Sequence, residues 1–155
     1  MTQIVMLFGN QRSGTNMIVR ALNVSPEVTL YNENHKDVFH NSTFISIEAM
    51  NEAAKKTSTR IALFKPISNT RDIFEIGKNY PEAYFILAVR HYLPVYHSFV
   101  AEFGSHGEKV IFNRLKKGIL DSTIDLLKKR EPEFSISGLE FNDIFLISWA
   151  HNLRL

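Results

Sequence analysis

The residues with the clearest chemical meaning lie in one short loop, residues 8–16, between an apolar run and a helical pattern. Gly9 and Gly14 permit backbone angles that side chains would block, so consecutive N–H groups can turn inward on an anion. A helix that begins near Gly14 adds its positive end and its free amides. The side chains of the loop that add donors or charge are Arg12, Ser13, Thr15 and Asn16. The loop is therefore predicted to cradle a phosphate, in the usual position for an α/β sheet.

The glycine spacing is that of the nucleotide-binding P-loop, but the residues that would serve magnesium are different. Thr15 and Asn16 follow the second glycine, where an NTPase has Lys and then Ser or Thr. Two later strands are followed by Lys65 and Arg90 rather than by the Asp that helps to hold the metal. We therefore expect an anionic nucleotide that is bound by side-chain cations without a metal.

Arg90 and Ser98 are candidates for a second anion contact. Arg90 ends the most strongly apolar of the predicted strands, so it should enter the crevice at the carboxyl edge of a parallel sheet. Ser98 lies in the following helix and can face the same cavity. An Arg offers a planar fork that matches phosphate oxygens, and a Ser offers a further donor.

The elements that must position these residues are read from hydrophobic periodicity. Strands are expected at 4–8, 28–31, 60–64 and 83–89, and helices near 14–22, 46–56, 69–78, 93–103, 108–130 and 140–153. Asn69 is the expected N-cap of the third helix. Alternating strands and helices, with strands apolar on both faces, predict an α/β three-layer sandwich around a central parallel sheet. No repeat or linker marks a boundary, so we expect a single domain over 1–155.

Composition narrows the function classes. The chain has 155 residues, of which 45% are hydrophobic and 22% charged, so a disordered, collagen-like or coiled-coil protein is excluded. A net charge of +2 is too small to indicate nucleic-acid binding. The absence of cysteine excludes a disulfide scaffold and thiol catalysis, and the histidines lack the spacing of a metal site.

No signal peptide and no apolar run of membrane length is present, so we expect a soluble, cytoplasmic protein with no membrane span. The last residues, 148–155, carry no helix stop signal and no following strand. We therefore expect the domain to be incomplete at its C-terminus, either as a fragment or as a natural truncation.

The loop GNQRSGTN resembles the 5′-phosphosulfate-binding loop of the sulfotransferases that use 3′-phosphoadenosine-5′-phosphosulfate (PAPS). The resemblance continues through FKPISNTRDIFEIGKNYPEAYFILAVRHYLPVYHSF, where the family has a strand that ends in Arg and a Ser eight residues later. The segment WAHN at 149–152 also looks like a helix seen in the family. The resemblance spans essentially the whole chain. It implies a P-loop NTPase-like fold, PAPS as the sulfuryl donor, no metal, and an acceptor with a hydroxyl or amine, such as a carbohydrate.

The resemblance also implies roles for individual residues. Lys65 stands where the family often has a Lys near the 5′-phosphate, and Glu33 stands where glycan-type members have their general base, with His35 as the reserve candidate. Arg12 would be the catalytic cation at the leaving oxygen. The donor-binding set would be Gly9, Arg12, Ser13, Gly14, Thr15, Asn16, Arg90 and Ser98. The usual Asp-Pro-Arg after the strand-ending Arg is here His91-Tyr92-Leu93, which leaves His91 without a role.

Two other functions stay open at this point. The first is a P-loop nucleotide kinase or NTPase, which the missing P-loop Lys disfavours. The second is a non-catalytic nucleotide-binding remnant of a sulfotransferase, which keeps the cradle without turnover. The acceptor, the oligomeric state and the choice between Glu33 and His35 as the base are not given by the sequence.

Overall fold

The computed structural model describes residues 2–116, 121–133 and 140–153. The chain divides into two compact units, Met1–Val89 and Arg90–Leu155. The expectation of one domain over 1–155 stays a prediction.

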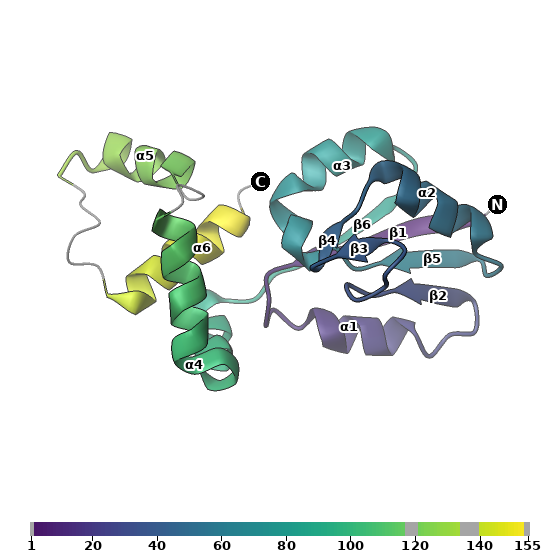
Figure 1. Ribbon diagram of the computed structural model, residues 1–155, viewed down its shortest axis with the longest axis horizontal. Helices are drawn as coiled ribbons and strands as arrows, with labels where there is room; N and C mark the ends of the chain where they lie inside the picture. The colour runs from purple at the N-terminus through teal and green to yellow at the C-terminus, as the bar shows by residue number, and fades with distance from the viewer. Residues whose placement is uncertain (1, 117–120, 134–139, 154–155) are drawn as a thin grey trace. The chain divides into compact units, whose positions relative to one another are not determined.

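The first unit is built on a parallel sheet of four strands (Figure 1). The strands, in the order in which they lie side by side, are β2 (Val28–Tyr31), β5 (Ile61–Phe64), β1 (Gln3–Gly9) and β6 (Tyr84–Ala88). All four strands were expected from short apolar runs, and their bounds agree within two residues. The α/β class and the parallel sheet are therefore confirmed.

Helices cover both faces of this sheet, with α1 (Thr15–Leu22) on one face and α2 (Ile47–Lys56) and α3 (Ile73–Asn79) on the other (Figure 1). The connection from β1 to β2 runs toward one edge of the sheet, whereas the two later connections run back across it. Because such crossovers are right-handed, opposite directions place their helices on opposite faces.

Side-chain alternation along the strands fills both layers of the core. Leu7 and Leu63 pack with Val19 of α1, whereas Met6, Phe8 and Phe64 pack with Met50 and Ile76 of α2 and α3. The two central strands, β1 and β5, are thus buried on both faces, which explains why their sequences are continuous apolar runs rather than alternating ones.

Two small elements were not expected. A hairpin of β3 (Phe39–His40) and β4 (Thr43–Phe44) turns through Asn41 and Ser42, which both have positive φ, as tight hairpin turns require. A 3-10 helix, η1 (Ile67–Asp72), precedes α3.

The expected N-cap role of Asn69 is wrong. Asn69 lies inside η1, where its side chain accepts a hydrogen bond from the Phe44 N–H (3.1 Å) and donates one to Asp72 (3.0 Å). Asn69 therefore ties the hairpin to η1, and α3 begins four residues after it.

The second unit contains α4 (Tyr92–Lys116), α5 (Asp121–Arg130) and α6 (Phe141–Asn152). Val95, Phe99 and Ile111 of α4 pack against Ile144 and Phe145 of α6. Gly104 (φ 46, ψ −138) breaks the helical geometry inside α4, close to the expected boundary between two helices. The expected helix over 108–130 falls partly on residues 117–120, which lie outside the described residues. In the described part of the chain, no helix is both long and apolar enough to cross a membrane.

Candidate functional site

The loop after β1 has a backbone that requires glycine at its first position. Gly9 has φ +153, and a Cβ added there would lie 2.8 Å from the Ala88 carbonyl oxygen of the neighbouring strand. Gly14 has φ +98 at the N-cap of α1, with open space around it. Arg12 also has a positive φ, of 67°. Such backbone angles are costly for a residue with a side chain, and they concentrate at functional sites.

The start of α1 presents donors that the protein does not cap with a side chain. Gly14 is the N-cap residue and has no side chain to offer to the first amides of the helix. Ser13 is buried beside it, and its hydroxyl has no hydrogen-bond partner among the described residues. A buried hydroxyl normally has a partner. A helix N-terminus together with an unpartnered buried hydroxyl suits the oxygen atoms of an anion.

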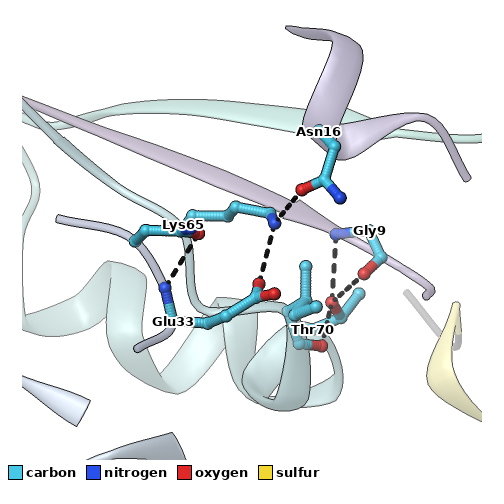
Figure 2. A network of polar contacts seen from close by, with 7 residues as sticks. Gly9, Asn16, Glu33, Lys65 and Thr70 are labelled. Atoms are coloured by element: carbon cyan, nitrogen blue, oxygen red, sulfur yellow. Dashed lines mark hydrogen bonds and ion pairs between the residues drawn. The ribbon is translucent and has the colours of Figure 1, made fainter. Parts of the chain in front are cut away.

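Lys65, directly after β5, lies at the centre of a polar cluster that joins three segments (Figure 2). Its Nζ lies 2.8 Å from Glu33 Oε2 and donates a hydrogen bond to Asn16 Oδ1 (2.5 Å). The strand order explains this meeting, because β5 lies between β2 and β1. Glu33 follows β2 on one side, and Asn16 follows β1 on the other. The structure thus brings together three of the residues predicted for the site.

The ammonium of Lys65 is buried, with 1% of the side chain exposed, whereas Glu33 keeps 20%. A buried charge must be paired, and its interactions are stronger than they would be in water. The ammonium has three donors, of which Asn16 accepts one, while Glu33 Oε2 pairs with its charge. A buried ammonium, held in place by Glu33 and Asn16, therefore lies at the carboxyl edge of the sheet, beside the first turn of α1.

Thr70 of η1 fixes the start of the loop, and sequence reasoning missed it. Its Oγ1 accepts a hydrogen bond from the Gly9 N–H (3.0 Å) and lies within donating distance of the Gly9 and Ile67 carbonyl oxygens (3.1 and 2.9 Å; Figure 2). Thr70 is fully buried. No local pattern could have found it, because Gly9 is 61 residues away in the chain.

The two candidate bases have different surroundings. Glu33 contacts Lys65, as described, whereas the His35 ring packs edge-on against Tyr31, with ring centroids 4.9 Å apart. His35 Nδ1 is buried and has no hydrogen-bond partner among the described residues. Of the two, Glu33 is the one that contacts the cluster around Lys65.

Arg90 and Ser98 belong to the second unit, so their expected meeting with the loop stays a prediction. Arg90 comes two residues after Ala88, the register partner of Gly9 in the sheet. Ser98 lies in α4. The role of His91 is local, because its Nδ1 accepts a hydrogen bond from the Leu93 N–H (3.3 Å) at the start of α4.

Among the described residues, no group of three or more His, Cys, Asp or Glu side chains is placed to hold a metal ion. In comparisons with known proteins, no family model, no curated protein and no solved structure matches the chain.

Proposed function

We propose that the chain is a PAPS-dependent sulfotransferase, or the nucleotide-binding part of one, with a P-loop-like fold. The observation that carries the proposal is the cluster of Lys65, Glu33 and Asn16 beside the loop 9–16. It combines a buried cation, a carboxylate and the uncapped start of a helix at the carboxyl edge of a parallel sheet. This edge is where α/β proteins bind their ligands.

The residues fit a phosphosulfate anion. The unpartnered hydroxyl of Ser13 and the amides at the start of α1 suit its terminal oxygens. Lys65 and Arg12 would balance the charge that collects on the leaving 5′-phosphate. When it is bound, PAPS supplies the sulfuryl group, which is transferred to an acceptor hydroxyl or amine with loss of 3′-phosphoadenosine-5′-phosphate.

Glu33 is proposed as the general base that takes the acceptor proton. A carboxylate that is partly exposed can reach a bound hydroxyl, and its contact with Lys65 holds it at the anion site. Arg90 and Ser98 are proposed to hold the 3′-phosphate, with Arg as a bidentate donor.

The test is transfer of labelled sulfate from PAPS to a panel of carbohydrate, lipid, phenol and amine acceptors, without magnesium. Glu33→Gln keeps a carbonyl oxygen for Lys65 but removes the base, so nucleotide binding should persist while transfer falls about 100-fold or more. His35→Gln is the matched control and should transfer at nearly the wild-type rate.

Other outcomes would point elsewhere. Hydrolysis or phosphoryl transfer that needs ATP and magnesium would favour a kinase or NTPase. Nucleotide binding without transfer to any acceptor, unchanged by Glu33→Gln, would favour a non-catalytic binding module.

A further inference from the structure

A second candidate site is a pocket of about 240 Å³ in the first unit. Its apolar walls are Phe44 of the hairpin, Ile47 and Met50 of α2, and Ile76 of α3. A pocket of this size suits a small ligand. Small-molecule sites are typically apolar hollows with a few polar groups that set orientation.

The neutral polar groups of the pocket are already used by the protein. Tyr80 donates its hydroxyl hydrogen to the Ile47 carbonyl (3.0 Å), and Ser46 accepts a hydrogen bond from the Ala49 N–H (3.1 Å). Asn69 bonds the Phe44 N–H and Asp72. These groups hold the walls together, so they leave little capacity to recognise a ligand.

Asp72 is the one charged residue among those that line the pocket. One of its carboxylate oxygens accepts from Asn69 (3.0 Å), and the other lies 3.5 Å from Arg71 Nε, with both side chains well exposed. Such an exposed pair is weak and readily exchanged. Glu48 supplies a second negative charge near Tyr80, a residue that lines the pocket. Burial first, and then the charge of Glu48, raise the pKa of Tyr80 to about 12.

We propose that this pocket binds a small primary amine with a short apolar body, the ammonium group pairing with Asp72. The body replaces water against Phe44, Met50 and Ile76, and the cation meets the carboxylate in the pocket wall. This proposal does not depend on the sulfotransferase proposal, because it uses none of the residues of the loop or of the Lys65 cluster.

The test is a titration followed by amide NMR shifts with three probes of equal length: hexylamine, hexanol and hexanoate. Hexylamine should shift the amides of Phe44, Asp72 and Ile76, and bind up to about fivefold more tightly than hexanol, as expected for a partly exposed ion pair. Hexanoate should bind most weakly. Equal binding of the three probes, or no shift at these amides, would overturn the proposal.

Two variants assign the effect to its residues. Asp72→Asn should reduce hexylamine binding to the level of hexanol, while Asp37→Asn, an exposed carboxylate of the same unit that does not line the pocket, should change nothing. Ile76→Phe should fill the pocket and weaken hexylamine and hexanol alike. An amine preference that survives Asp72→Asn would refute the role of Asp72.

Discussion

The ion pair between Lys65 and Glu33 makes a quantitative prediction about stability. Removing one partner of a buried pair costs about 3–5 kcal/mol, because the other charge is left buried. Glu33 is 20% exposed, so some water can reach the remaining charge. We therefore expect Glu33→Ala to lower the free energy of unfolding by about 2–4 kcal/mol, since it leaves the more deeply buried ammonium.

Lys65→Met should be less damaging, because it leaves the more exposed carboxylate and keeps the apolar length of the side chain. We expect a loss of about 1–2 kcal/mol, of the size found when a polar group loses its partner. The double variant should be more stable than the sum of the single losses implies, with a coupling energy of about 1.5 kcal/mol or more.

The assay is urea unfolding of the four proteins of this double-mutant cycle: the wild type, the two single variants and the double variant. Far-UV circular dichroism reports both units, and fluorescence of the single tryptophan, Trp149, reports the second unit, so the transition of the first unit can be separated. The matched control is Glu27→Ala, which breaks an exposed pair with Arg60 at 3.8 Å and should cost less than about 0.5 kcal/mol. Additive losses within about 0.5 kcal/mol would refute the claim that the Lys65–Glu33 contact is a buried, coupled pair.

Three further predictions concern single positions. We expect Gly14→Ala to lower the free energy of unfolding by about 1–2 kcal/mol and Gly9→Ala to lower it by more. Both glycines have positive φ, but only at Gly9 would the added Cβ lie against a backbone oxygen. Equal losses in thermal unfolding would contradict this. Thr70→Val should lower the free energy of unfolding by about 1–3 kcal/mol, because it leaves the Gly9 N–H without its partner. The Gly9 amide hydrogen should also exchange faster with deuterium. An unchanged exchange rate would argue against the contact. The pKa of Tyr80 is raised to about 12 in the folded state, from 10 in the unfolded state, so its contribution to the free energy of unfolding is complete below pH 10 and is lost as the pH rises toward 12. Tyr80→Phe should therefore reduce the loss of stability between pH 10 and 12. An unchanged pH dependence of stability would refute this prediction.

The parts of the fold that could be predicted are those that depend on local sequence. The four strands are short apolar runs. The loop 9–16 is marked by two glycines five residues apart, at positions where the backbone has positive φ. The hairpin at 39–44 was missed because each of its strands has two residues, too few for an alternating pattern.

The contacts that give the site its chemistry depend on strand order, which periodicity does not reveal. Lys65 meets Glu33 and Asn16 only because β5 lies between β2 and β1. The sequence places Lys65 directly after a predicted strand and Asn16 in the loop after another, but it does not indicate that Lys65 and Glu33 would pair directly. The Thr70–Gly9 contact is equally non-local.

The central claim is that the loop and Lys65 bind the nucleotide of a sulfuryl donor. Its most direct test is calorimetric titration with 3′-phosphoadenosine-5′-phosphate without magnesium, beside ATP with magnesium. We predict that the first ligand binds, and that Lys65→Met weakens its binding by about tenfold or more, as for loss of a charged hydrogen bond. Preference for ATP with magnesium, or no binding of 3′-phosphoadenosine-5′-phosphate by the folded wild-type chain, would contradict the claim.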